Sequence, residues 1–265
     1  MTTLQIVILA IVQGITEFLP ISSSGHLVLV PYLFGWTDQG LAFDVAVHFG
    51  SLIAVCVYFR NDIAVLLSGG RQVLLGQIKT PESRMAAAIA LGTVPAALAG
   101  LFFASWIEQN LRDPAVIVCT LAGYGILMAV ADRYGRRERN MAGVGYKDAV
   151  IIGCAQALAL VPGTSRSGIT ITAARFLGFD RQDAARFSFL MSAPVIFLAA
   201  GYKFVELVTG SAAVAWGQLS IGALVACVVA YVSIDFFMRV VSRIGLLPFA
   251  IFRVILAAII LYVLV

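Results

Sequence analysis

The sequence predicts an all-α integral membrane protein with six transmembrane helices and two re-entrant helical hairpins, arranged as an inverted-topology repeat. Three observations lead to this fold class. The 265 residues are 61% hydrophobic and only 12% charged, about half the charged fraction of a soluble domain. Apolar segments recur in the order short pair, three long runs, short pair, three long runs. Polar breaks interrupt the two short pairs at corresponding places.

The first short pair of apolar segments opens the chain. Residues 4–16 form an uncharged run of 13 residues, whereas a membrane span needs roughly 18 or more and a run of about 10–14 is typical of a re-entrant or buried segment. Pro20 ends the helix, three serines and a glycine follow, and residues 25–36 give a second short piece. We therefore expect a re-entrant hairpin that enters and leaves the membrane by the same side.

Three longer apolar runs follow this hairpin, and we expect each of them to span the membrane. They comprise residues 43–59, 85–106 and 114–131. The segment between the first two, residues 60–84, is polar and contains two adjacent glycines and a proline, so we expect a loop there. Residues 132–147 form a second loop, which is strongly basic.

The second half of the chain repeats this order. Residues 149–161 are again 13 uncharged residues, broken by Pro162 and Gly163, and residues 169–174 are the second short piece. A polar stretch then leads to three more expected spans. The stretch covers residues 175–186, and the spans cover residues 187–202, 218–238 and 246–265.

Identical residues at matching positions support an internal repeat. An offset of 143 residues aligns Gln13 with Gln156, Ser22 with Ser165, Ser24 with Ser167 and Gly25 with Gly168, and an offset of 134 aligns Pro114 with Pro248. These identities agree with the order of the apolar segments. We expect one membrane domain over residues 1–265, with a first repeat over about residues 1–140 and a second over about 146–265.

The basic residues predict how this domain is oriented. Three spans per repeat is an odd number, so the second repeat must be inverted relative to the first. The loops on one side then carry 14 of the 18 Lys and Arg residues, and the other side carries only Arg112 and Lys203. The positive-inside rule places the basic side in the cytoplasm. Both termini would face outward and the tips of the two hairpins would meet near the midplane. Basic residues in such loops indicate membrane orientation rather than nucleic-acid binding.

Two ionisable residues lie inside apolar segments. Glu17 and Arg166 are costly at such positions, and residues of this kind usually face the protein interior and carry function. The alternative is a purely structural ion pair that braces the hairpins. Gln13 precedes Glu17 by four residues, so one helical face carries both side chains.

Each hairpin break carries a cluster of hydroxyl groups and glycine before a short apolar helix. Free backbone N–H groups at a helix start, with hydroxyls beside them, bind anions, although ordinary N-capping by serine is the alternative. The candidate phosphate-binding residues are Ser22, Ser23, Ser24, Gly25, Thr164, Ser165, Ser167 and Gly168. Arg166 adds a planar fork that matches phosphate oxygens, so we expect the two clusters to hold a diphosphate together.

Two histidines accompany these clusters. His26 directly follows the first one and is a candidate acid, base or nucleophile because imidazole titrates near neutral pH, with a structural role as the alternative. His48 lies four residues after Asp44 on the first expected span, and we interpret that pair as a cavity lining or as support for the site.

The two motifs at residues 13–26 and 162–168 closely resemble the signatures of the bacterial undecaprenyl-diphosphatase family, also called the bacitracin-resistance phosphatase family. The resemblance extends over essentially the whole chain. It implies an enzyme of the bacterial inner membrane that removes the terminal phosphate of undecaprenyl diphosphate, recycles the carrier lipid for cell-wall synthesis and confers bacitracin resistance. It also implies a divalent cation, Mg²⁺ or Ca²⁺.

The resemblance assigns roles to individual residues. The essential Ser, His and Arg of the family fall on Ser23, His26 and Arg166. The acidic motif of the family has Glu or Gln, then three residues, then Glu. Because its first position is Gln13 here, Glu17 carries the acid role alone and is the candidate metal ligand.

Several readings of mechanism and function stay open at this point. Ser23 is the first choice for nucleophile, activated by His26 or Glu17, followed by water with Glu17 as base and by a phosphohistidine at His26. A polyprenyl-phosphate flippase or transporter would use the same phosphate-binding clusters, and a lipid-binding scaffold is the third reading. The expected partners are the lipid substrate and membrane lipid, with a homodimer as one allowed assembly.

Overall fold

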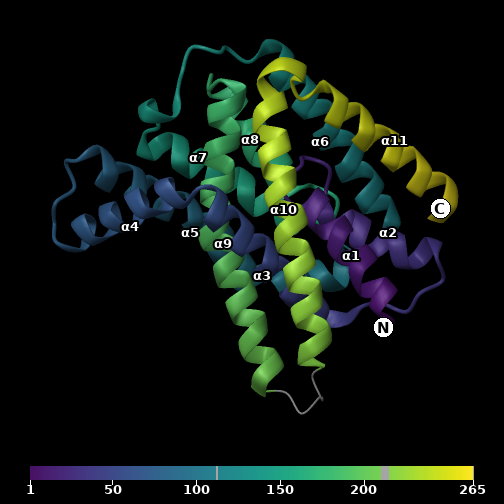
Figure 1. Cartoon of the computed structure of the whole chain (residues 1–265). Helices are drawn as coiled ribbons and strands as arrows, with labels where there is room; N and C mark the ends of the chain where they lie inside the picture. The colour runs from purple at the N-terminus through teal and green to yellow at the C-terminus, as the bar shows by residue number, and fades with distance from the viewer. Residues whose placement is uncertain (112, 210–214, 265) are drawn as a thin grey trace.

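The computed structural model describes residues 1–111, 113–209 and 215–264, and these residues form an all-α protein (Figure 1). Among the described residues, Arg139 and Phe179 also form an isolated β-bridge. The helices are α1 (Thr3–Thr16), α2 (Ser23–Leu33), α3 (Gly40–Tyr58), α4 (Arg60–Leu74), α5 (Pro81–Asn110), α6 (Pro114–Tyr134), α7 (Tyr146–Ala157), α8 (Arg166–Phe176), α9 (Arg181–Thr209), α10 (Trp216–Ile244) and α11 (Leu247–Leu264).

Five helices are long and apolar enough to cross a membrane: α3, α5, α6, α9 and α10. The predicted class, an α-helical integral membrane protein with several spans, is therefore confirmed. The sixth expected span, residues 246–265, corresponds to α11. Within the part of the chain described, α11 and α1 are apolar helices that are shorter than these five. The count of six spans and two re-entrant hairpins stays a prediction. Arg112, one of the residues used to assign the sides, lies outside the described residues.

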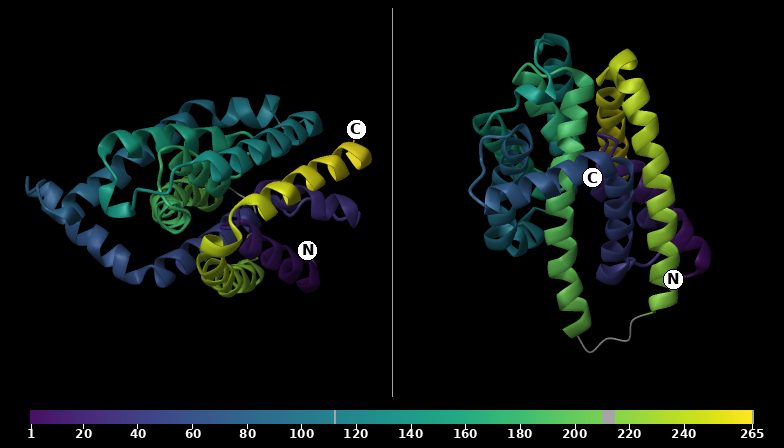
Figure 2. Two further views of the ribbon diagram at one scale, coloured as in Figure 1. Left: turned by 90° about the horizontal axis from the view of Figure 1, so that it is seen from above. Right: turned by 60° about the vertical axis from the view of Figure 1, so that its left-hand side comes forward.

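The loop predicted over residues 60–84 is wrong, because its first half is helix α4. Asp62 in the first turn and Arg71 in the last turn complement the helix dipole, and the polar residues alternate with apolar ones such as Leu66 that pack inward. The sequence pattern was amphipathic rather than simply polar. The helix lies beside α5 and projects to one side of the molecule (Figures 1 and 2).

The polar stretch over residues 175–186 is also mostly helical. It contains the end of α8 and the beginning of α9, which starts at Arg181 rather than at the expected residue 187. Two of its arginines pair with carboxylates of other helices, one of them a buried carboxylate. Arg181 donates to both carboxylate oxygens of Asp132 at 2.6 and 2.7 Å, and Arg186 pairs with Asp62 on α4. Charge pairing at a helix start lets this segment stay helical.

The helices pack in reciprocal pairs across the two halves of the chain. Helix α1 lies on α10 and α7 lies on α5, while α6 packs on α11 and α3 packs on α9. Figure 2 shows α3 between the long helices α9 and α10. Each half therefore completes its packing only with helices of the other half.

Glycines allow the closest of these contacts. A Cβ atom on Gly14 of α1 would lie 2.9 Å from the carbonyl oxygen of Ala226 on α10, and one on Gly50 of α3 would overlap the backbone of Ala223. Gly153 of α7 meets the backbone of Gly92 on α5 in the same way. Small residues at such positions let helix backbones approach closely, which is how helices associate without a hydrophobic driving force in lipid.

Arg139 ties the beginning of α7 to the segment that follows α8. Its guanidinium donates to the Asp148 carboxylate and, at 3.0 Å, to the carbonyl oxygen of Leu177. It also lies over the ring of Phe179, 4.3 Å from the centroid. Burial alone would raise the pKa of Asp148, but hydrogen bonds from Arg139 and from the backbone N–H of Gly145 hold that pKa below its ordinary value. The outer ends of α7 and α8 are thus fixed at the same side.

Candidate active site

The two helix breaks share an unusual backbone conformation. Ser22 has φ 75° and Ser165 has φ 67°, and they are the non-glycine residues with positive φ within the described ranges. They are the N-caps of α2 and α8. A non-glycine residue in this region costs on the order of 1 kcal/mol or more and occurs mostly at functional sites. The two serines are equivalent under the 143-residue offset predicted from the sequence.

The side chains around these serines also match. The hydroxyl of Ser22 lies 3.3 Å from that of Ser24, and the hydroxyl of Ser165 lies 3.4 Å from that of Ser167. Ser165 accepts a hydrogen bond from the N–H of Gly168. Since the first N–H groups of a helix have no acceptor within the helix, each break presents hydroxyls and backbone donors together.

The second break is held from outside by two side chains. Thr120 of α6 donates to the carbonyl oxygen of Pro162 at 2.6 Å, and Arg253 of α11 donates to that of Gly163 at 3.1 Å. Arg253 is almost completely buried and also donates to the carbonyl oxygens at residues 120 and 121. Gly163 itself has φ +85°, a conformation that glycine adopts at little cost.

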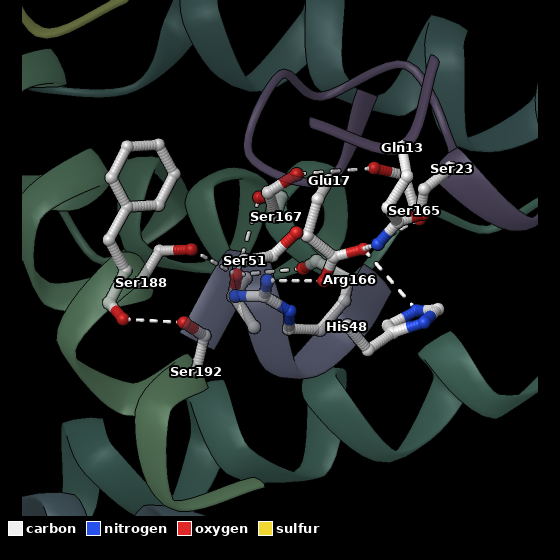
Figure 3. A network of polar contacts seen from close by, with 12 residues as sticks. Gln13, Glu17, Ser23, His48, Ser51, Ser165, Arg166, Ser167, Ser188 and Ser192 are labelled. Carbon is white, nitrogen blue, oxygen red and sulfur yellow. Dashed lines mark hydrogen bonds and ion pairs between the residues drawn. The ribbon is translucent and has the colours of Figure 1, made fainter. Parts of the chain in front are cut away.

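The Glu17 carboxylate is the centre of the site (Figure 3). Its Oε1 accepts a hydrogen bond from Nη2 of Arg166 at 2.9 Å. Its Oε2 accepts from the hydroxyl of Ser23 at 2.8 Å and from the amide of Gln13 at 3.0 Å, and faces Nε2 of His48 at 3.6 Å. Glu17 is only 7% exposed, so four side chains surround one buried carboxylate.

Arg166 joins the two hairpins. It starts α8 in the second hairpin and contacts Glu17 in the first, and its guanidinium lies 5.6 Å from the ring centroid of Phe18. The hydroxyl of Ser167 adds a second link by donating to the carbonyl oxygen of Leu19 at 3.1 Å. The hydroxyls of Thr170 and Ser188, 2.6 Å apart, fix α8 against α9. The structure therefore brings Glu17 and Arg166 together, as the sequence predicts.

Several buried polar atoms at the site have no protein partner. Among the described residues they include Nη1 of Arg166, Oε1 of Gln13 and Oγ1 of Thr164. An unsatisfied buried polar group costs roughly 1–3 kcal/mol, so each requires an explanation. A ligand with oxygen atoms would satisfy the arginine and threonine donors at once.

His26 does not contact this network. Its Nδ1 lies 2.7 Å from the carbonyl oxygen of Ser22, and its ring stacks on Phe252 with the centroids 5.6 Å apart. The histidine that faces Glu17 is His48 of α3. The sequence signal for His48 was a polar position four residues after Asp44, which indicates an inward face but does not say which residue it meets.

The residues at Glu17 do not form a ligand set for a divalent cation. Both carboxylate oxygens accept hydrogen bonds, and the four neighbours include a guanidinium, an amide nitrogen and an imidazole, whereas Mg²⁺ and Ca²⁺ prefer six or more oxygen ligands. No group of three His, Cys, Asp or Glu residues comes together in the described parts of the chain. The cation that the resemblance implies stays a prediction.

Comparison with known proteins places this chain in a family. Residues 6–259 match the family model described as bacitracin resistance protein BacA, which covers nearly the whole chain. The chain belongs to this family. Its relatives include Undecaprenyl-diphosphatase 2 of Stutzerimonas stutzeri (strain A1501), which is 49% identical over 264 residues and covers 98% of each chain.

Two further relatives of the BacA family carry the name Undecaprenyl-diphosphatase. The protein from Hahella chejuensis (strain KCTC 2396) is 52% identical over 258 residues, and the protein from Teredinibacter turnerae (strain ATCC 39867 / T7901) is 51% identical over 256 residues, with 97% of each chain covered in both cases. The family resemblance inferred from the two motifs is therefore confirmed.

Proposed function

We propose that this protein is an undecaprenyl-diphosphatase, which hydrolyses undecaprenyl diphosphate to undecaprenyl phosphate and inorganic phosphate. The observation that carries the proposal is the partly buried cluster of Glu17, Ser23 and Arg166 at the junction of two helix N-termini. Relatives about half identical to this chain over nearly their full length bear that name. The reaction would return the carrier lipid to cell-wall synthesis and would give resistance to bacitracin when the protein is abundant.

The diphosphate binds between the two helix breaks. The N–H groups and hydroxyls at the starts of α2 and α8 surround its oxygens, and the unpaired Nη1 of Arg166 donates to one of them. The residues assigned to this binding are Gln13, Ser22, Ser24, Gly25, Thr164, Ser165, Ser167 and Gly168. Phosphoryl transfer depends mainly on positioning and charge stabilisation, which this arrangement of donors provides.

The prenyl chain has an apolar path away from this site. A groove of about 460 Å³ lies between α3, α9 and α10 and is lined on α3 by Ala46 and Phe49. Ala46 and Phe49 are close to His48 in the sequence of α3, and the imidazole of His48 faces Glu17. We assign the beginning of the prenyl chain to this groove.

Ser23 is the nucleophile that the geometry supports. Its hydroxyl already donates to Glu17 at 2.8 Å, which is the contact that a general base requires. In the first step the Ser23 oxygen forms a bond to the terminal phosphorus, the bridging P–O bond breaks, and undecaprenyl phosphate leaves with that electron pair while Glu17 takes the proton. Water then attacks the phosphoserine, inorganic phosphate leaves, and the Ser23 oxygen regains a proton.

Two alternatives differ in the attacking group. Water with Glu17 as base uses the same carboxylate in a single step. A phosphohistidine at His26 is the third choice, because that ring stacks on Phe252 and lies outside the Glu17 network. Parallel rapid quenching in acid and at neutral pH distinguishes the three. An acid-stable phosphoserine is expected, a phosphohistidine found only after the neutral quench favours His26, and absence of phosphoenzyme in both favours water.

We also propose the orientation and repeat predicted from the sequence. The matched serines at positive φ and the reciprocal packing of α1 on α10 and α7 on α5 support two inverted repeats. The link that Arg139 makes between the outer ends of α7 and α8 supports a re-entrant second hairpin. The site would open to the outer face of the bacterial inner membrane, with both termini on that face.

A flippase is the second candidate function, because hairpins that meet between inverted repeats are also a transporter architecture. Release of phosphate separates the two. Purified wild-type protein in detergent is expected to liberate inorganic phosphate from undecaprenyl diphosphate, and Glu17→Gln is expected to liberate almost none. Ile53→Ala, at an exposed position of α3, is the matched control and should keep the wild-type rate. Lack of phosphate release by the wild-type protein would contradict the proposed enzyme.

A further inference from the structure

His48 is the neighbour of Glu17 that the reaction described above does not use. Its Nε2 lies 3.6 Å from Oε2 of Glu17, and its Nδ1 lies 2.7 Å from the backbone carbonyl oxygen of Asp44, one turn earlier on α3. The side chain is 35% exposed, whereas that of Glu17 is 6% exposed. His48 therefore connects the buried carboxylate with a more open part of the site.

The contact with Asp44 decides which nitrogen carries a fixed proton. A carbonyl oxygen can only accept a hydrogen bond, so Nδ1 must be the donor and must be protonated. The nitrogen that can gain or lose a proton is Nε2, which faces Glu17. Once Glu17 has taken the Ser23 proton, its carboxyl group becomes a donor, and Nε2 is the ring nitrogen that faces it.

The same carboxylate oxygen serves the attacking group. Oε2 of Glu17 accepts the Ser23 hydroxyl at 2.8 Å on one side and faces Nε2 of His48 on the other. Arg166 holds the second oxygen, Oε1, and Gln13 steadies Oε2. Hydroxyl, carboxylate and imidazole are thus contiguous, in an order that allows a proton to move from Ser23 toward His48.

Other charged groups on α3, α9 and α10 have contacts of their own. Asp44 contributes its backbone oxygen to Nδ1, while its carboxylate accepts from Gln39 at 3.0 Å. Asp235 of α10 accepts a hydrogen bond from Tyr58, the last residue of α3. Helix α9 carries Lys203, which lies beside Glu206 of its own helix. Glu17 faces the His48 imidazole, and Arg166 holds the other carboxylate oxygen of Glu17.

We propose that His48 is the proton partner of Glu17, and this proposal rests on the proposed phosphatase function. As the Ser23 oxygen bonds to phosphorus and the bridging P–O bond breaks, the hydroxyl proton passes to Glu17 and then to Nε2 of His48. The imidazolium keeps the proton until the water that cleaves the phosphoserine has reacted and Ser23 is protonated again. His48 acts through Glu17 and is a positioning residue.

The test measures phosphate release by His48→Ala and His48→Gln over a range of pH, beside the wild-type protein and the Ile53→Ala control. We expect kcat to fall by about a hundredfold in both His48 variants, as for loss of a proton-transfer group, with KM almost unchanged. The acid side of the pH profile should change in both. Added imidazole should restore part of kcat to His48→Ala but not to His48→Gln, whose side chain fills the space.

Each other outcome counts against the proposal. An unchanged kcat, or a loss that keeps the wild-type pH profile and is not rescued by imidazole, would show that His48 only holds structure, and the phosphatase function would stand. A wild-type protein without phosphate release would overturn both proposals. Melting temperatures in detergent show whether the variants fold, and the bulkier His48→Gln decides the question if His48→Ala does not.

Discussion

At the scale of single residues, the site depends on what surrounds one carboxylate. Glu17 is buried with a guanidinium, an imidazole, an amide and a hydroxyl around it. A buried carboxylate is expensive unless it is paired and hydrogen-bonded, so these partners keep it ionised and able to accept the proton of Ser23. The positive φ of Ser22 and Ser165 adds backbone strain on both sides of the same cluster.

Arg166 gives the sharpest prediction at this scale. Arg166→Ala removes the partner of Glu17 and the donor for phosphate, each a charged hydrogen bond worth about 1.5–3 kcal/mol, so we expect kcat/KM to fall by about a hundredfold or more. Arg166→Lys should recover only a small part, because one ammonium group cannot donate to both groups as the guanidinium fork does. The measurement is phosphate release, with melting temperature as the check on folding. Full activity in Arg166→Lys would contradict the two-partner role.

At the scale of helices, the hairpins reach each other because glycines allow close packing. Gly50 lets α3 lie against Ala223 of α10, and α3 carries His48 to the site. Helix α1, which leads to Glu17, relies on Gly14 in the same way. The positions of Glu17 and His48 therefore depend on contacts made by residues outside the proposed site.

Gly50→Ala tests this dependence. The new Cβ would overlap the backbone of Ala223, and overpacking of this kind typically costs about 1–3 kcal/mol, so we expect a lower melting temperature in detergent and reduced activity. Gly100→Ala is the matched control, because Gly100 lies in helix α5 with no atom within 4 Å of an added Cβ. It should be neutral or slightly stabilising. Equal melting temperatures for the two variants would contradict the close contact.

At the scale of the whole molecule, the fold joins two halves that cannot complete their packing alone. The polar clamp of Asp132 with Arg175, Arg181 and the N–H of Leu246 links the ends of α6, α8, α9 and α10 near the basic loops. Such a cluster is compatible with the cytoplasmic interface, and the proposed site then opens on the opposite side. A homodimer stays a prediction.

Cysteine labelling checks this orientation. Thr37→Cys, at an exposed position between α2 and α3, should react with a membrane-impermeant thiol reagent in intact cells whose outer membrane is permeabilised. Arg137→Cys, exposed in the basic loop, should react only in inverted vesicles. Both changes are made in a background without Cys56, Cys119, Cys154 and Cys227. The reverse pattern would invert the proposed topology.

The sequence by itself determined the membrane class, five of the spans, the two breaks and the polar residues at the breaks. Apolar run length, proline and glycine signals and charge are local properties, so they can be read from the chain. It mistook α4 for a loop, because amphipathic polarity at an interface resembles that of a loop until the packing partner α5 is known.

Only the tertiary structure decided which residues meet. In the fold, Arg166 contacts Glu17, which lies 149 positions earlier in the sequence. The hydroxyl of Ser23 donates to Glu17 rather than contacting His26, and His48 of α3 faces the same carboxylate. A helical pattern shows which face of a helix is inward, but the neighbour that this face meets is set by the packing of all the helices together. For that reason the residue types of this site could be predicted from the sequence, whereas the contacts among them required the fold.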